Sequence, residues 1–544
     1  MSLLSRFVGR RWKLPAPITR DIRVEPLRIP MRDGVTLLAD RYYPRGAPSA
    51  PVVLIRSCYG RSAFKFIATL FAERGMQVVM QSCRGTFGSE GVFRPFFDEQ
   101  DDGADTVEWI EGQPWFSSQL ALWGVSYLGN TAWATARSSA GAKIDALGLH
   151  VTLTNFRDRT YAFDGFTLIT CLDWTIMMVN LVRTGGGNLV SRILGQRKMK
   201  ALSQHAAATI PLRKADQLIA PDGVSWRQDW MDHAEPGDPW WQQVDYGAAA
   251  QSLPPTVMTG GWYDIFLPFQ LRDFTNAQQA GRDVRITIGP WTHPAIPGFA
   301  ESLRQSITLF QEQFGLGLSA SSQTARRPRV RLFLMGANEW REYSSWPPPS
   351  RVAHTLYLQP SGRLSLDAPA AEGESTFDYD PAHPTPAFYG ATLEGGKGSG
   401  DMAQLEQRSD VLVFTAEPLA ADVDAIGPVS AQIFLRSNTE HTDLYLCLCD
   451  VTREGRSTNV CDGYRRLRPD GTATRQVEIE FWPTAYRFRA GHRIRIIVAG
   501  GAHPRYARNP GSGEPLGDAA TMLIAHQHIL HGPQHPSAIR LSAL

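Results

Sequence analysis

One serine stands in a pattern that could make it a nucleophile. Residues 123–129 read Trp-Gly-Val-Ser-Tyr-Leu-Gly, between a strand-like run and a helix-like run. A tight strand-to-helix turn exposes a serine hydroxyl, and the helix N-terminus favours negative charge that develops beside it. The spacing departs from G-x-S-x-G, because the glycines are Gly124 and Gly129. The strand–turn–helix context still favours Ser126 as a nucleophile.

A serine hydroxyl needs a base to remove its proton, and a later histidine could supply one. His293 comes just after a strand-like run, in Gly-Pro-Trp-Thr-His, and Asp264 comes just after an earlier run, in Gly-Gly-Trp-Tyr-Asp. Alone, Asp264 could cap a helix and His293 could belong to an ordinary turn. Together with Ser126, however, the three have the residue types and the chain order of a Ser-Asp-His triad.

The strands and helices expected around these residues indicate how the three side chains are brought together. From residue 22 to about 150, strand-like and helix-like runs alternate after an initial hairpin. Such alternation predicts an α/β fold with a parallel sheet covered on both faces. The carboxyl ends of its strands meet at one edge, where ligands bind. We therefore expect the three candidate side chains at that edge.

The pattern of strand-like and helix-like runs changes twice more along the chain. We predict an α/β core over residues 1–150 and 246–319, a helical cap inserted at 151–245, and a jelly-roll-like β-sandwich over 320–544. The cap is expected because the alternation of strand-like and helix-like runs stops at about residue 151 and resumes after residue 245. The sandwich is expected because short alternating runs recur between turns rich in Gly, Pro, Asp and Ser.

Composition excludes several classes of protein. Lys and Arg number 55 and Asp and Glu 53, a net charge of +2, so nothing draws the chain to nucleic acid or to an anionic membrane. No apolar run reaches the roughly 18 residues of a membrane helix, and the first residues lack a signal-peptide core, so a cytoplasmic protein is expected.

Six cysteines do not make a disulfide scaffold, and Cys447 and Cys449 share one strand face. His526 and His528 could hold a metal, but a polar surface pair is the commoner case; no metal site is expected.

Several segments resemble the CocE/NonD family of serine hydrolases, the cocaine-esterase-like relatives of X-Pro dipeptidyl-peptidases and α-amino-acid ester hydrolases. The matching segments are IPMRDGVTLLADRYYP, LIRSCYGR, QSCRGTFGSEGVFRPF, DDGADTVEWIEGQPW, WGVSYLG, GGWYDIF, IGPWTH and FWPTAYRFRAGHRIRI. The resemblance covers nearly the whole chain from residue 22, and it explains the departure from G-x-S-x-G. It implies an α/β-hydrolase domain, a helical cap and a C-terminal jelly roll.

The resemblance also implies roles for individual residues. Ser126 would be the nucleophile, His293 the general base and acid, and Asp264 the carboxylate that orients the histidine. The Tyr59 hydroxyl and the Tyr127 backbone N–H would hold the oxyanion. The reaction would be two-step acyl transfer to water, with no metal or organic cofactor.

The substrate expected from the sequence is a small ester, with no nucleic acid or membrane partner; a homodimer is also allowed. The residues after Asp264 are not acidic, and 21 residues precede the first matching segment, which disfavours enzymes that bind a free amino terminus. An apolar pocket is expected, and candidates for its lining are Phe266, Phe166, Trp174, Met177 and Met178. Arg84 and Asp102 could both be structural salt-bridge partners around the nucleophile turn, and no catalytic role is assigned to them. The alternatives are a dipeptidyl-peptidase or other amide hydrolase, an acyltransferase, and a non-catalytic ligand-binding protein.

Overall fold

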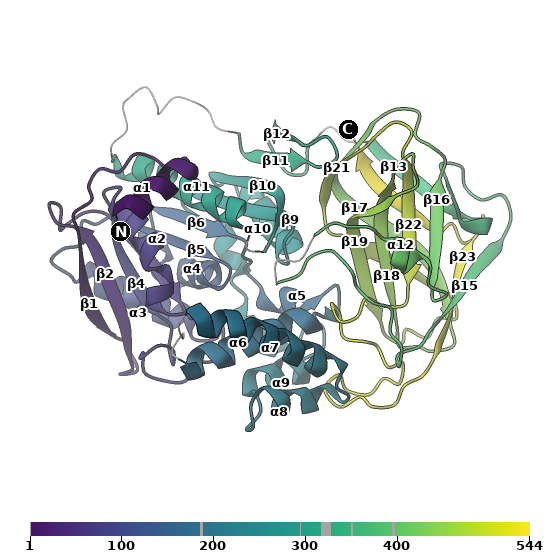
Figure 1. The fold of residues 1–544 in the computed structure, drawn as a ribbon, viewed down its shortest axis with the longest axis horizontal. Coiled ribbons are helices and arrows are strands. Elements are labelled where there is room, and N and C mark those ends of the chain that lie inside the picture. The colour runs from purple at the N-terminus through teal and green to yellow at the C-terminus, as the bar shows by residue number, and fades with distance from the viewer. Residues whose placement is uncertain are drawn as a thin grey trace.

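The computed structural model describes residues 2–184, 189–293, 295–316, 328–349, 352–393 and 398–543. Figure 1 shows an α/β half beside a β-rich half, with helices of the cap below. Over the described residues, none of the helices combines the length and the apolar character needed to cross a membrane.

The α/β half is built on a mixed sheet with the strand order β1-β2-β4-β3-β5-β6-β9-β10-β11-β12. These strands are β1 (Ile22–Pro30), β2 (Thr36–Pro44), β3 (Val52–Ser57), β4 (Gln77–Ser82), β5 (Leu120–Val125), β6 (Ala146–His150), β9 (Thr256–Tyr263), β10 (Val284–Thr292), β11 (Val330–Leu334) and β12 (Glu339–Tyr343). The pairs from β4 through β11 are parallel, and every residue of β3, β4, β5 and β6 is buried. The predicted parallel sheet is confirmed, and so is the antiparallel hairpin of β1 and β2.

Helices cover both faces of this sheet. On one face lie α3 (Glu99–Glu111), α4 (Tyr127–Arg137) and α10 (Leu267–Gln279); on the other lie α2 (Lys65–Ala72) and α11 (Ile296–Phe314), with α1 (Ser2–Arg11) against α2. Trp123 of β5 packs between rings of the second face, Phe71 and Phe299. Because both faces are covered, the carboxyl ends of the strands are the part of the sheet left for a site.

The chain between β6 and β9 forms the helical cap. It contains α5 (Phe156–Thr160), β7 (Tyr161–Ala162), β8 (Gly165–Phe166), α6 (Leu168–Thr184), α7 (Leu189–Ala208), α8 (Ala215–Ile219) and α9 (Ser225–Asp232). Its aromatic and apolar residues bury one another in a cluster that also takes in Tyr127, next to Ser126. A helical insertion is therefore present over the sheet edge; its limits at residues 151 and 245 remain a prediction.

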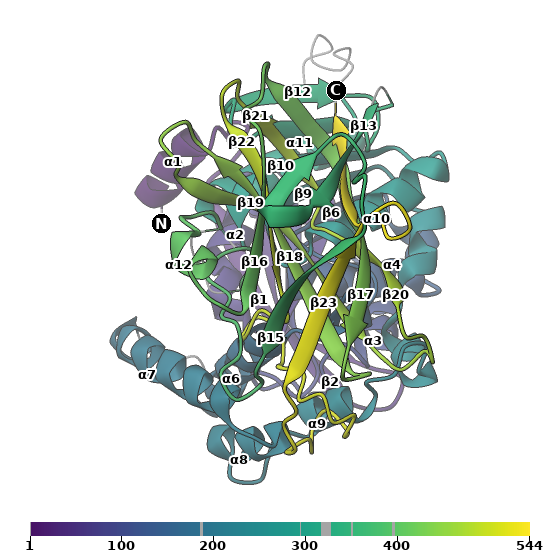
Figure 2. The same cartoon turned by 90° about the vertical axis from the view of Figure 1, so that its right-hand side faces the viewer.

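The β-rich half is mainly antiparallel, with the strand order β15-β23-β17-β24-β13-β14-β16-β22-β18-β19 and with β20 and β21 paired to β17. Its elements are β13 (Val352–Gln359), β14 (Arg363–Ser365), β15 (Gly373–Tyr379), α12 (Ala403–Glu406), β16 (Val411–Ala416), β17 (Val423–Ser437), β18 (Thr442–Val451), β19 (Ser457–Leu467), β20 (Arg475–Glu480), β21 (Thr484–Phe488), β22 (Arg493–Ala499), β23 (Ala525–His531) and β24 (Ala538–Ala543). Figure 2 shows these strands in front of the α/β half.

The predicted start of the β-sandwich needs a correction. Residues 319 and 320, where the boundary was expected, lie outside the described residues. Residues 330–334 fall within the predicted sandwich, but β11 pairs in parallel with β10 and β12 pairs with β11, so these two strands extend the first sheet. An alternating apolar pattern indicates a strand, but it does not say which sheet the strand joins.

Candidate active site

Ser126 occupies the turn between β5 and α4, with φ 55° and ψ −125°. Positive φ is strained for a residue with a side chain, and such strain persists where the surroundings hold it in place. The glycines make this turn sterically feasible: a Cβ on Gly124 would lie 2.1 Å from the Leu128 carbonyl, and one on Gly129 would lie 2.7 Å from Thr152. The spacing G-x-S-x-x-G is thus what this turn requires, although it departs from the commoner motif.

Asp264 and His293 follow β9 and β10, and both lie close to Ser126. His293 Nε2 is 3.1 Å from Ser126 Oγ, and His293 Nδ1 is 2.8 Å from Asp264 Oδ2. The carboxylate is fully buried and the imidazole is 3% exposed. A neutral histidine in this setting carries its proton on Nδ1, towards the carboxylate, so Nε2 can accept the serine proton.

The loop that carries Asp264 is held from two sides. The Phe266 N–H donates to Asp264 Oδ1 at 2.8 Å, which orients the carboxylate from within its own loop. The indole N–H of Trp482, which follows β20, donates to the Asp264 carbonyl at 3.1 Å. The β-rich half therefore contacts the acid of the site directly.

Tyr59 follows β3 and lies at the same edge. Its hydroxyl oxygen accepts a hydrogen bond from the Trp174 indole N–H at 3.0 Å. Desolvation by the surrounding side chains raises the pKa of Tyr59 well above its ordinary value, so the hydroxyl keeps its proton. A phenol oxygen that accepts one hydrogen bond still has its own O–H to donate, and Tyr59 lines both cavities that meet at Ser126. Tyr127 is the first residue of α4, and a backbone N–H at that position is not used within the helix.

The Tyr127 side chain is anchored by buried polar groups on α3 and β3. Its hydroxyl donates to Glu99 Oε1 at 2.7 Å and accepts from the Phe96 N–H at 3.0 Å. Arg56 Nη2 lies 2.8 Å from Glu99 Oε2, and both side chains are almost completely buried. These contacts hold the residue whose backbone N–H adjoins the nucleophile.

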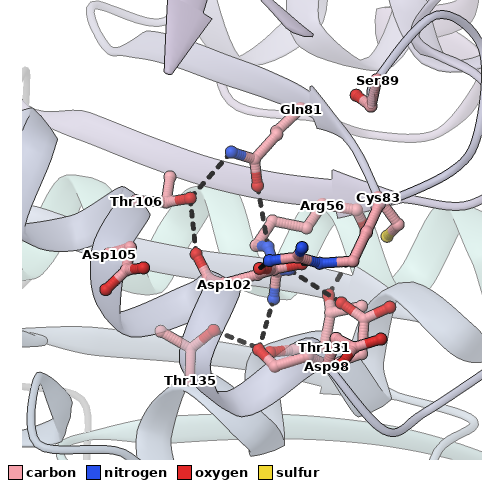
Figure 3. Close-up of polar contacts among 12 residues, drawn as sticks. Arg56, Gln81, Cys83, Ser89, Asp98, Asp102, Asp105, Thr106, Thr131 and Thr135 are labelled. Carbon is pink, nitrogen blue, oxygen red and sulfur yellow. Dashed lines mark hydrogen bonds and ion pairs between the residues drawn. The ribbon is translucent and has the colours of Figure 1, made fainter. Parts of the chain in front are cut away.

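The same network continues away from the site (Figure 3). Arg56 Nε donates to Gln81 Oε1 at 2.8 Å, and Gln81 Nε2 donates to Thr106 Oγ1 at 2.7 Å. Asp102 accepts from Arg84 Nη2 at 2.5 Å and from Arg84 Nε at 3.2 Å. Arg84 and Asp102 are thus salt-bridge partners, and their ion pair ties α3 to the loop after β4.

Two cavities meet at Ser126. The larger has a volume of about 600 Å³ and is mainly apolar; its lining includes His293, Trp174 and Met177. The smaller has a volume of about 20 Å³. Its lining includes Tyr127, Phe156, Arg159, Trp174 and Phe266.

The predicted pocket residues divide accordingly. Trp174 and Met177 line the larger cavity, and Trp174 and Phe266 the smaller. Phe166 and Met178 are instead fully buried in the cap core, so their assignment to the pocket needs correction. Successive residues of a helix point about 100° apart, so Met178 cannot face the same way as Met177. Phe166, on β8, packs on Tyr161.

The local sequence does not indicate that several other residues lie at the site. Trp12, just after α1, and Leu393, from the β-rich half, line the larger cavity, and Leu393 also lines the smaller. Arg159 and Glu99 belong to charged helical stretches that resemble solvated surface. Each reaches the site through tertiary packing, and hydrophobic periodicity does not predict contacts between segments far apart in the chain.

The remaining polar candidates have ordinary partners. Across the described residues, no group of three or more His, Cys, Asp or Glu side chains is arranged to hold a metal ion. His526 pairs with Asp378 and His528 with Glu374 on the surface of the β-rich half.

Two family models match the chain in succession. The X-Pro dipeptidyl-peptidase (S15 family) model matches residues 33–295, and the X-Pro dipeptidyl-peptidase C-terminal non-catalytic domain model matches residues 322–540. Cocaine esterase of Rhodococcus sp. (strain MB1 Bresler) is 31% identical, over 94% of this chain and 97% of that protein.

Solved structures share the fold over the full length. An aminopeptidase from a marine sediment archaeon, Thaumarchaeota archaeon, has a TM-score of 0.79 at 21% identity, covering 96% of each chain. An α-amino acid ester hydrolase has a TM-score of 0.78 at 20% identity, covering 98% of each chain. At these identities the likeness concerns the architecture: an α/β-hydrolase domain, a cap and a β-sandwich.

Proposed function

Because the chain belongs to the S15 family and to the cocaine-esterase-like (CocE/NonD) hydrolases, it is a serine hydrolase acting on esters, and we propose that Ser126, His293 and Asp264 carry out the reaction through an acyl-enzyme. The observation that carries this proposal is the 3.1 Å separation of His293 Nε2 and Ser126 Oγ, at a serine held with positive φ.

In the first step, His293 Nε2 takes the hydroxyl proton while Ser126 Oγ attacks the acyl carbon. The Tyr59 O–H and the Tyr127 N–H stabilise the oxyanion that develops. Asp264 stabilises the imidazolium that forms and keeps the ring in place. His293 then gives its proton to the departing alkoxide oxygen, and the alcohol leaves.

In the second step, water attacks the acyl carbon of the ester formed on Ser126. His293 takes a proton from this water, and the tetrahedral intermediate forms in the same oxyanion hole. When it collapses, the acid leaves and Ser126 Oγ recovers its proton from His293. The reaction needs no group beyond these side chains, the backbone N–H and water.

The two cavities suggest how an ester is oriented. The leaving oxygen must face the histidine that protonates it. His293 lines the larger cavity and is not among the described residues that line the smaller one. We therefore assign the alcohol half of the substrate to the larger, apolar cavity and the acyl half to the smaller cavity.

The lining of the smaller cavity favours an esterase over an X-Pro peptidase. A substrate with a free amino terminus needs a carboxylate or similar acceptor for its ammonium group. None of the described residues around the smaller cavity is acidic, and one, Arg159, is cationic. This charge opposes an ammonium group at the acyl end.

Labelling with a fluorophosphonate, followed by peptide mapping, tests the nucleophile. The wild-type protein should be labelled on Ser126 and should hydrolyse p-nitrophenyl butyrate. Ser126→Ala should lose both properties while keeping its unfolding midpoint. Ser62→Ala, at an exposed serine near the site, is the matched control and should keep both.

Persistent labelling of Ser126→Ala would place the nucleophile elsewhere. Cleavage of dipeptidyl p-nitroanilides in preference to esters would favour the peptidase alternative. Formation of a new ester when an alcohol is added, at the expense of free acid, would favour an acyltransferase. A folded wild-type protein with neither labelling nor turnover would leave a ligand-binding function.

A further inference from the structure

Arg159 on α5 is a buried cation next to the proposed acyl site. The residue is 4% exposed. Among the described residues, the polar partner of its guanidinium is the Cys171 sulfur, 3.2 Å from Nη1. A cysteine sulfur is a weak acceptor. The neighbouring Asp158 does not compensate, because it pairs with Arg272.

This pairing is unlike that of other buried arginines in the described part of the chain. Arginines of comparable burial each have a carboxylate partner; they are Arg41, Arg56, Arg74, Arg227, Arg475 and Arg505. A charge taken out of water without a counterion is costly, and proteins ordinarily pair it. Arg159 differs from these arginines because no carboxylate among the described residues pairs with it.

Arg159 borders space that continues from the nucleophile. Arg159 lines the smaller cavity together with Ser126, and it also lines an adjoining cavity of about 10 Å³. Arg505 lines this second cavity as well, although Asp462 is its partner. The far end of the acyl side therefore has a net positive charge and no acid among the described residues that line it.

On the premise of the proposed function, we infer that Arg159 binds a carboxylate at the far end of the acyl group. The substrates would be half esters of short dicarboxylic acids, with an apolar alcohol in the larger cavity. The two acyl-side cavities are small, about 20 and 10 Å³, which favours a short chain over an aromatic acyl group. A planar guanidinium suits a carboxylate because it can donate two parallel hydrogen bonds.

Two matched esters test the inference. Monobenzyl succinate and benzyl butyrate have acyl groups of similar length, and only the first carries a carboxylate; release of benzyl alcohol measures both. The ratio of kcat/KM for the succinate over the butyrate ester should fall about tenfold or more in Arg159→Met and less in Arg159→Lys, because a charge-assisted hydrogen bond is lost or rearranged. Arg157→Met, on the same helix outside both cavities, should keep the wild-type ratio.

A ratio that stays unchanged in Arg159→Met would overturn the inference, as would an equal loss of turnover for both esters. If Arg159→Met does not fold, the wild-type protein provides the test. Succinate should slow fluorophosphonate labelling of Ser126 at concentrations where butyrate does not, and equal effects of the two acids would overturn the inference. If the inference fails but the protein still turns over the butyrate ester and is labelled on Ser126, the proposed function stands. If the protein shows neither labelling nor turnover of any ester, the proposed function itself is contradicted.

Discussion

Replacing Tyr59 by phenylalanine should lower kcat by about 10²- to 10³-fold. The substitution removes one oxygen and its proton and keeps the ring. Desolvation raises the pKa of Tyr59, so the lost group is a protonated donor. The Trp174 N–H uses a lone pair of the hydroxyl oxygen, so the O–H itself can still donate. One donor to a developing oxyanion is worth about 2.7–4 kcal/mol, which corresponds to the predicted loss. The Tyr127 N–H remains and should preserve residual turnover.

Steady-state kinetics on p-nitrophenyl butyrate can measure this loss. KM should change little, because the oxyanion exists only during the reaction and not in the bound ester. The substitution also leaves the Trp174 N–H without its acceptor, so the free energy of unfolding should fall by about 1–3 kcal/mol. Adding Trp174→Phe should recover part of that stability without restoring kcat. Tyr43→Phe, on β2, is the control for loss of a tyrosine hydroxyl elsewhere.

Three results would count against the reasoning. A kcat within about threefold of wild type would remove Tyr59 from the oxyanion hole. A large rise in KM at constant kcat would mean that the hydroxyl binds the ground state instead. A loss of turnover matched by Tyr43→Phe would point to a general effect on folding.

Three further perturbations test other parts of the site. Asp264→Asn should lower kcat by about 10⁴-fold with little loss of stability, because the amide favours the wrong tautomer of the histidine; a loss below tenfold in turnover assays would contradict the assigned role. Gly124→Ala should destabilise the fold by about 3 kcal/mol or more in denaturant unfolding, because the new Cβ meets the Leu128 carbonyl at 2.1 Å; Gly46→Ala, with open space around its Cβ, is the control, and equal stabilities would refute the steric argument. Burial lowers the pKa of His150 from 6.5 to about 3. As the pH falls, the unfolded chain therefore takes up a proton at this residue before the folded protein does. The free energy of unfolding should then fall by about 2 kcal/mol between pH 6.5 and pH 5 through this group. His150→Gln should remove that part of the pH dependence in unfolding curves, and an unchanged profile would contradict it.

Sequence alone determined the backbone plan of the α/β half as far as β10, and the identity of the three candidate catalytic residues. Both follow from local rules: buried parallel strands are continuous apolar runs, and residues that directly follow such strands lie at one edge of the sheet. Ser126, Asp264 and His293 each follow a strand of this kind. Their meeting could therefore be predicted without knowing any side-chain packing.

Tertiary structure alone decided what surrounds these residues. Trp482 reaches Asp264 from 218 positions away along the chain. Met177 faces the cavity while Met178 faces the cap core, and β11 joins the first sheet instead of the second. Arg159 shows the physical reason most clearly: its sequence context resembles a solvated helix surface, but whether a charge is paired, hydrated or buried depends on which distant elements pack against it.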